Sequence, residues 1–291
     1  MRSALSYTAG LFKQRAPEFA GPTLLALSGG RSSAMLLKVM LEVHGGILPN
    51  NYVVVFTNTG KEAPETLDFL HNIEQNWNVA IVWLELSEMR GGKVDYKQVD
   101  YYTASRNGAP FEVLLSAKPN YPPRRSARLC TMYMKTEVSH LFAQRRWPDS
   151  QQKWTKLLGY RADESHRLYA ALLRCGKPHT PYVVAAPLVT LNIVKRDVLS
   201  FFSQNNFNLE LDDCLGNCSL CFLKGEAILQ KAVIARPAEG VWWADYERRV
   251  GRYILPRGGY SALMARARGE LPPLSPSLTE DLTDLECNCT D

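Results

Sequence analysis

Six consecutive residues, Ser28-Gly29-Gly30-Arg31-Ser32-Ser33, have the types and order that a phosphate-binding loop needs. The glycines allow backbone torsions that are closed to other residues, and they let phosphate oxygens approach the chain. A helix that begins here would add unpaired amides and the positive end of its dipole. The three serines add hydroxyl donors, and Arg31 adds a cationic donor. The pattern therefore predicts an anion site, and a capped strand–turn–helix junction is the alternative.

Cysteine spacing predicts a second kind of chemistry. Cys214, Cys218 and Cys221 fall within one short segment, and Cys130 is a fourth thiol far from them in the sequence. Four thiolates suit an iron–sulfur cluster or a tetrahedral zinc ion. Two alternatives stay open: Cys218 and Cys221 form a dithiol redox pair, or Cys130 is a nucleophile or a buried residue. An odd total of 7 cysteines without a secretion signal argues against a disulfide scaffold.

Two further cysteines, Cys287 and Cys289, lie in the acidic stretch at the end of the sequence. A cysteine on a tail that swings can attack an electrophilic sulfur and pass the product on by thiol exchange. Neighbouring carboxylates raise the pKa of such a thiol and work against its reactivity. An exposed tail without a function explains the pattern equally well.

The elements that must position these residues follow from hydrophobic patterning. Apolar runs predict buried strands over 23–27, 52–56 and 79–84, and amphipathic segments predict helices over 33–44 and 64–77. This alternation predicts an α/β fold, a parallel sheet with helices on both faces. Ligands of such sheets bind outside the carboxyl ends of the strands, where the Ser28–Ser33 loop falls.

The remaining chain gives weaker signals. Over 87–123 we expect a long irregular excursion, acting as a lid. Further elements are expected as a helix starting near Thr131, strands ending over 156–159 and over 185–189, and helices over 195–205 and 225–234. The predicted organisation is a nucleotide-binding domain over 1–212, a cysteine-bearing appendage over 213–271 and a mobile acidic tail over 272–291.

Five motifs follow one another between about residues 24 and 225, and their order carries a family resemblance. They are Ser28-Gly29-Gly30, Phe56-Thr57-Asn58-Thr59-Gly60-Lys61-Glu62, Arg128-Leu129-Cys130-Thr131 with Lys135, Gly159-Tyr160-Arg161-Ala162-Asp163-Glu164-Ser165 with Arg167, and Gly216-Asn217-Cys218-Ser219-Leu220-Cys221-Phe222-Leu223-Lys224. This ordered set resembles the phage-type members of the phosphoadenosine phosphosulfate reductase-like family. That family belongs to the PP-loop adenine nucleotide alpha-hydrolase superfamily.

The resemblance implies an adenine nucleotide, ATP or phosphoadenosine phosphosulfate, and a [4Fe-4S] cluster in preference to zinc. Implied catalytic residues are Cys287, Arg161, Lys135 and Glu164. Implied ligands of the nucleotide are Ser28, Gly29, Gly30, Arg31, Ser32, Ser33, Thr57, Asn58, Thr59, Gly60, Glu62, Arg128 and Arg167. Implied ligands of the metal are Cys130, Cys214, Cys218 and Cys221.

Two positions depart from the family pattern. Ser32 stands where ATP pyrophosphatases have an aspartate, so Glu62 or Asp163 would have to supply a carboxylate for magnesium-bound phosphate chemistry. The chain also ends in Glu286-Cys287-Asn288-Cys289, which shares only Glu-Cys with the tail motif of the sulfate-assimilation reductases.

Composition sets the outer bounds. The 291 residues are 46% hydrophobic and 22% charged, as in an ordinary globular protein, and no apolar run reaches the ~18 residues of a membrane span. The N-terminus has no targeting pattern, so we expect a cytoplasmic protein without a membrane partner. A net charge of +5 suits an anionic ligand and permits a nucleic-acid partner.

Three functions are compatible with this sequence. The first is sulfonucleotide reduction or sulfur transfer, with a thiol reductant such as thioredoxin or a sulfur donor as partner. The second is an ATP-dependent sulfurtransferase that thiolates nucleic acid. The third is a non-catalytic nucleotide-binding regulatory module, which the missing loop aspartate favours.

Overall fold

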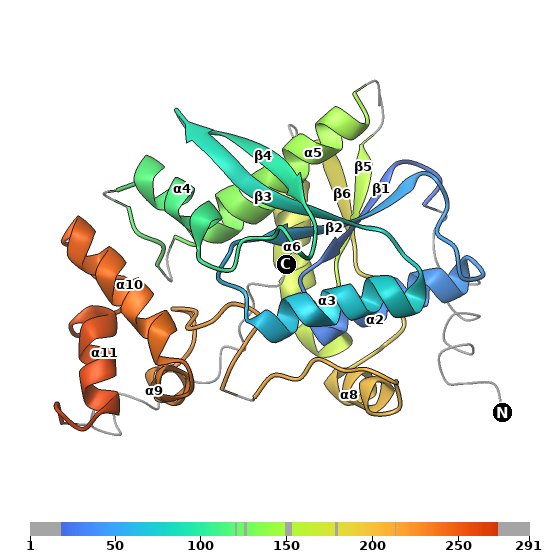
Figure 1. The fold of residues 1–291 in the computed structure, drawn as a ribbon. Helices are drawn as coiled ribbons and strands as arrows, with labels where there is room; N and C mark the ends of the chain where they lie inside the picture. The colour runs from blue at the N-terminus through green and yellow to red at the C-terminus, as the bar shows by residue number, and fades with distance from the viewer. Residues whose placement is uncertain are drawn as a thin grey trace.

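The computed structural model describes residues 19–119, 121–124, 127–148, 153–177, 180–212 and 214–272. These residues build a six-stranded sheet with the order β4-β3-β2-β1-β5-β6 (Figure 1). The strands are β1 (Thr23–Leu27), β2 (Tyr52–Asn58), β3 (Ile81–Arg90), β4 (Lys93–Val99), β5 (Trp154–Leu157) and β6 (Tyr182–Ala185).

The sheet is parallel except at one edge. β1 pairs in parallel with both β2 and β5, and only β4 runs antiparallel, against β3. The chain moves outward from β1 to β2 and β3, then returns to the other side of β1 for β5 and β6. The strand order therefore reverses between β1 and β5, and ligands of open α/β sheets bind at such a reversal.

Helices cover both faces of this sheet, as the sequence predicted. Leu25, Phe56 and Trp83 share one core with α2, α3 and α8. Leu24, Val55 and Leu84 share the opposite core with α4, η1, α5 and the C-terminal helices. The helices are α2 (Arg31–Val43), α3 (Pro64–Trp77), α4 (Ala109–Ala117), η1 (Cys130–Glu137, a π-helix), α5 (Val138–Arg146), η2 (Ala162–Glu164, 3-10), α6 (Ser165–Cys175), α7 (Pro187–Thr190), α8 (Lys195–Ser203), α9 (Glu226–Ala235), α10 (Pro237–Val250) and α11 (Gly259–Ala267).

The expected irregular excursion over 87–123 is wrong in large part. β3 continues to Arg90, turns, and pairs with β4, after which α4 packs on the sheet. The sequence signal for β4 is weak, because Val94 and Tyr96 alternate with polar residues but Gln98 interrupts the pattern, and the side chains of this edge strand are half-buried or exposed.

The strand expected to end over 185–189 is present as β6, but it stops at the first of these residues. β6 ends at Ala185, and Pro187 begins the short helix α7 instead. Proline fits the first turn of a helix because the missing amide would have had no partner there. The predicted mobile tail, with Cys287 and Cys289, lies outside the described residues.

No helix in the described ranges combines the length and the apolar character that crossing a membrane requires. The helices α9, α10 and α11 pack against one another beside α4 (Figure 1). Their aromatic side chains belong to the same core as the sheet residues Leu24 and Val55.

The fold generates a pH prediction at Lys156, a lysine of β5 that is only 6% exposed. Its pKa is lowered from 10.5 to about 8, chiefly because burial disfavours the charge and secondly because Arg174 is near, while Glu137 opposes the shift. Below pH 8 the folded protein holds a buried charge, and as the pH rises from 8 towards 10.5 only the unfolded chain keeps the proton. Folding stability from this group therefore rises with pH in that window.

We expect Lys156→Met to stabilise the protein at pH 7 by on the order of 2 kcal/mol, with the gain shrinking towards pH 10.5. Urea unfolding at pH 7 and pH 10 measures the difference. Lys153→Met, at an exposed position just before β5, is the matched control and should change little at either pH. An equal gain at both pH values would contradict the assigned cause.

Candidate functional site

The Ser28–Ser33 loop connects β1 to α2 and is closed by its own hydroxyl groups. The Oγ of Ser33 accepts a hydrogen bond from the amide of Ser28 at 3.1 Å and lies 2.8 Å from the Oγ of Ser28. The amide of Gly30 donates to the Oγ of Ser28 at 3.3 Å. Helix α2 then begins at Arg31. The loop thus leaves the carboxyl end of β1, beside the reversal of strand order.

Two glycines allow the segments around this loop to touch. Gly29 has φ of +81°, and a Cβ there would lie 2.3 Å from the Cγ2 of Thr66 on α3. A Cβ on Gly159, just after β5, would lie 2.7 Å from the Cα of Ser33. The segment that follows β5 therefore lies directly against the loop. Gly159 was not among the predicted site residues, although it begins one of the motifs.

A network of charges follows Gly159 and reaches the loop. Nη1 of Arg161 donates to the Oγ of Ser32 at 3.0 Å, and Nε donates to Asp163 at 3.0 Å. Glu164 accepts from the backbone amide of Arg161 at 3.2 Å and from Nη1 of Arg167 at 2.5 Å. Glu164 is thus an orienting carboxylate that holds both arginines beside the loop.

The protonation state of this network follows from its contacts. Burial alone would raise the pKa of the Asp163 carboxyl, but the hydrogen bond and the charge of Arg161 bring it below its usual value. Asp163 is therefore ionised at neutral pH. Arg161 is 8% exposed, so its charge acts at short range on any anion that enters beside Ser32.

Two further predicted cations are Arg31 and Arg128, and the charge of Arg128 acts on the Tyr160 hydroxyl, as that of Arg167 does. Nε of Arg31 donates to Oδ1 of Asn208 at 2.8 Å, and its Nη2 donates to the backbone oxygen of Leu209. The guanidinium thus contacts the segment after α8. Arg128 is half-buried in the turn that leads into η1.

The chain leaving β2 forms a second loop, over 57–63, whose polar groups contact the protein. Oε2 of Glu62 accepts from the amide of Thr59 at 2.8 Å and from its hydroxyl at 2.7 Å. The side-chain amide of Asn58 donates to Glu85 at 2.7 Å and to the backbone oxygen of Ser105 at 2.8 Å. Of the two roles considered for Glu62, this geometry gives it the role of closing the loop. Thr57 and Gly60 are buried beside it.

Three of the four predicted thiol ligands line one small cavity behind this loop. Cys130 reaches it from η1, and Cys218 and Cys221 reach it from the cysteine turn, defined here as residues 218–221. The cavity has room for about one water-sized sphere. Its lining is completed by Thr59, Phe111, Thr131, Lys135, Phe222 and Trp243.

The fourth predicted ligand does not line the cavity. Cys214 is half-buried, and its backbone oxygen accepts from Nζ of Lys224 at 2.7 Å. Across the described ranges, no three Cys, His, Asp or Glu side chains are gathered as a metal site. All five described cysteines are free thiols. The structure therefore brings three thiols to a common cavity, and the metal stays a prediction.

Electrostatics at the cavity keep Cys130 protonated. Burial raises the pKa of the Cys130 thiol, and the nearby charge of Lys135 only partly lowers it. Nζ of Lys135 lies 3.7 Å from Oε1 of Glu62, an oxygen without a hydrogen-bond partner among the described residues. A buried carboxylate oxygen without a hydrogen bond is costly, so the surroundings of Glu62 favour a further donor or cation.

The C-terminal helices support the cysteine turn from behind. The hydroxyl of Tyr260 donates to the backbone oxygen of Leu220 at 2.6 Å, and the ring of Tyr260 stacks on Trp243 with centroids 5.4 Å apart. Leu220 has φ of +53°, a strained value for a residue with a side chain. Tyr260 thus holds the residue between Cys218 and Cys221 in an unfavourable conformation.

Sequence reasoning missed two residues that hold the site together, Tyr260 and Asn217. The side-chain amide of Asn217 donates to the backbone oxygen of Ser28 at 3.1 Å, which joins the cysteine segment to the Ser28–Ser33 loop. Asn217 belongs to the Gly216–Lys224 motif and precedes Cys218, and that position was the one sequence feature that pointed to it. Nothing near Tyr260 in the sequence pointed to the cysteines.

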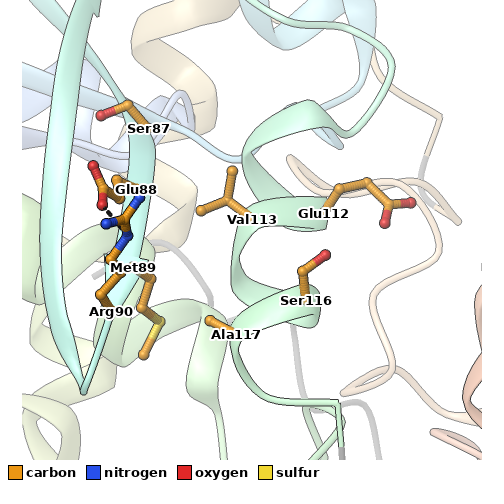
Figure 2. A pocket seen from close by; sticks show the side chains of 8 residues that line it. All are labelled: Ser87, Glu88, Met89, Arg90, Glu112, Val113, Ser116 and Ala117. Carbon is orange, nitrogen blue, oxygen red and sulfur yellow. Dashed lines mark ion pairs between the residues drawn. The ribbon is translucent and has the colours of Figure 1, made fainter.

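A larger hollow of about 480 Å³ lies between the end of β3 and α4 (Figure 2). Its charged side chains have partners: Glu88 pairs with Arg90 at 2.6 Å, and Glu112 pairs with Arg249 at 2.6 Å. None of its lining residues is a predicted site residue. We therefore place the candidate site at the loop and the thiol cavity.

The chain matches no protein-family profile. It is similar to the "uncharacterized nin region protein ORF290" of Escherichia phage lambda, with 27% identity over 207 residues. The match covers 69% of this chain and 66% of the phage protein.

The support from Tyr260 predicts a selective effect of one hydroxyl. Tyr260→Phe should destabilise the protein by about 1–2 kcal/mol and raise the rate at which Cys218 and Cys221 react with a maleimide, because the cysteine turn loses its hydrogen bond. Tyr246→Phe is the matched control, since the buried hydroxyl of Tyr246 has no hydrogen-bond partner in the described part of the chain. Equal effects of the two changes would rule out the proposed support.

Proposed function

We propose that this chain binds an adenine nucleotide at the Ser28–Ser33 loop and performs sulfur chemistry with the adjoining thiols, as a phosphoadenosine phosphosulfate reductase-like enzyme. One observation carries the proposal. A glycine-rich strand–loop–helix turn at the reversal of strand order is joined by hydrogen bonds to a cavity lined by Cys130, Cys218 and Cys221. Such turns bind phosphate through backbone amides, and thiols are the side chains that react with electrophilic sulfur.

In the reductive form of this chemistry, a cysteine thiolate attacks the sulfur of the sulfonucleotide. A sulfur–sulfur bond forms, the bond from sulfur to the phosphate oxygen breaks, and the nucleoside phosphate leaves with the electron pair. A second thiol then displaces sulfite and leaves a disulfide, which a thioredoxin-like dithiol reduces. Arg161, held by Glu164 beside Ser32, would stabilise the charge on the leaving phosphate.

The attacking cysteine is proposed as Cys287, from the segment outside the described residues, with Cys130 as the second candidate. Lys135 would stabilise the negative charge of a Cys130 thiolate, because both residues line the same cavity. The raised pKa of Cys130 disfavours it as the nucleophile.

An iron–sulfur cluster is part of the proposal. The donor set fits in chemistry, because Cys130, Cys218 and Cys221 face one cavity and Cys214 lies four residues before Cys218. A bound [4Fe-4S] cluster, or a zinc ion as the less favoured occupant, would be held by these thiolates and would supply a site for sulfide. The room present matches a single ion better than a cluster, so a cluster requires the cysteine turn to move outward.

A second candidate is an ATP-dependent sulfurtransferase that thiolates nucleic acid. The observation in its favour is the ionised Asp163, whose carboxylate binds Arg161 next to Ser32. This carboxylate is close to the loop position where ATP pyrophosphatases have an aspartate, and it would assist a magnesium-bound phosphate. Glu62 is a weaker substitute because Thr59 occupies one of its oxygens.

Ligand binding tests the proposal directly. ATP and phosphoadenosine phosphosulfate should be compared by thermal shift and calorimetry on the wild type, Ser28→Ala and Gly30→Val. We expect one of the two nucleotides to bind and both variants to weaken it, Gly30→Val by roughly ten-fold or more. A Cβ at Gly30 would lie 3.0 Å from Nδ2 of Asn217, so valine displaces the loop.

Ser203→Ala, which removes an exposed hydroxyl of α8, is the control and should bind as the wild type does. Sulfite release that depends on thioredoxin supports the reductase, and pyrophosphate release from ATP that nucleic acid increases supports the sulfurtransferase. Nucleotide binding without either activity leaves a regulatory module. Wild-type protein that binds neither nucleotide contradicts the proposal as a whole.

Metal content tests the cysteine assignment separately. Protein purified without oxygen should carry iron with a broad visible absorbance, or zinc in its place, and Cys218→Ser should lose most of that metal. Cys175→Ser is the matched control, because Cys175 is equally buried but donates to the backbone oxygen of Leu172 on α6. Wild-type protein free of both metals would remove the cluster from the proposal.

A further inference from the structure

Asn217 joins the Ser28–Ser33 loop to the cysteine turn. Its side-chain amide donates to the backbone oxygen of Ser28 at 3.1 Å. Its own backbone oxygen accepts from the amide of Ala63 at 2.8 Å. The next residue along the chain is Cys218. One residue therefore contacts the loop after β1, the loop after β2 and the cysteine turn.

The pairing continues from Asn217 into the cysteine turn. Cys218 forms an antiparallel bridge with Glu62, and the amide of Ser219 donates to the backbone oxygen of Lys61 at 2.8 Å. Residues 217–219 thus lie as a short strand against 61–63. An opening of the cysteine turn would have to break these backbone bonds, which lie directly beside the bond from Asn217 to Ser28.

The side chain of Asn217 is tightly packed. Asn217 is 8% exposed, and a Cβ on Gly30 would already lie 3.0 Å from its Nδ2. The amide of Gly30 makes a long bond of 3.3 Å to the Oγ of Ser28, so it has a weak internal partner that a phosphate oxygen could replace. An anion that fixes Gly30 and Ser28 therefore also fixes the acceptor that Asn217 uses.

We infer that Asn217 is a positioning residue that couples nucleotide occupancy of the loop to the accessibility of Cys218 and Cys221. The inference rests on the proposed nucleotide binding at this loop and adds its regulation. Both thiols are buried, so a reagent reaches them only when the turn opens locally. A ligand that binds only the closed loop makes that opening rarer, provided that the two events are linked.

The experiment measures maleimide labelling of single cysteines by mass spectrometry, with and without saturating ATP and, separately, phosphoadenosine phosphosulfate. In the wild type, the nucleotide that binds should slow the labelling of Cys218 and Cys221 by roughly five-fold or more. Asn217→Asp, which keeps the shape but cannot donate to Ser28, should lose most of this protection at a nucleotide concentration that calorimetry shows to saturate the variant. Asn217→Ala is the second variant, in case the added charge disturbs folding.

Two controls make the result specific. Labelling of Cys175, a buried thiol on α6, should not respond to nucleotide in any variant. Asn208→Ala removes the contact with Arg31 on the other side of the loop and should keep the protection of Cys218. Thermal unfolding of each variant shows that the labelling reports local opening rather than a loss of the fold.

Each outcome decides a separate claim. If calorimetry detects binding but the labelling of Cys218 does not change in the wild type, the coupling is wrong and the proposed function stands. Protection that persists unchanged in both Asn217 variants also overturns the role of Asn217. If neither nucleotide binds, the proposed function fails at the calorimetric step and the coupling falls with it.

Discussion

The antiparallel contact between residues 217–219 and 61–63 is the constraint on which the site depends. It ties a segment that arrives late in the chain to the loop after β2, and through Asn217 to the loop after β1. Without it, the Ser28–Ser33 loop would be an ordinary strand–helix junction and the thiols would lie on an independent turn. The contact uses buried backbone groups, so breaking it would leave amides and carbonyls without partners. That cost holds residues 217–219 against residues 61–63.

The C-terminal helices serve the same constraint from the opposite side. Glu247 on α10 accepts from the backbone amides of Ile254 and Tyr260, each at 2.7 Å, and so fixes the turn that leads into α11. That turn positions Tyr260 against Leu220. Burying this carboxylate costs free energy even though several amides donate to it, and burial raises the pKa of Glu247 accordingly. The fold tolerates this cost because Glu247 positions Tyr260, which in turn positions the cysteine turn.

Local sequence patterns predicted the central elements well and the edges poorly. The apolar run of β1, the helix α3 and the Ser-Gly-Gly turn are determined by neighbouring residues, so their bounds could be predicted from composition and spacing. β4 and α7 could not, because the alternation in the edge strand β4 is short and its side chains are half-buried or exposed, and a short helix depends on one proline. The convergence of Cys130 with Cys218 and Cys221 was predicted, whereas the separation of Cys214 and the contact of Arg31 with Asn208 depend on long-range packing that no local pattern records.

The charges around the cavity bear on how the thiols can act. A cysteine that is to be a nucleophile in the resting protein needs a lowered pKa, usually from a cation without a competing anion. Here the ammonium of Lys135 lies 3.7 Å from Glu62, so part of its field is cancelled, and burial raises the pKa of Cys130. A metal ion would reverse both effects, because it removes the proton from a bound thiol and adds positive charge beside the unbonded oxygen of Glu62. The electrostatics of the cavity therefore favour Cys130 as a ligand or a buried thiol over Cys130 as a free nucleophile, and the proposed attack on sulfur is better assigned to another cysteine.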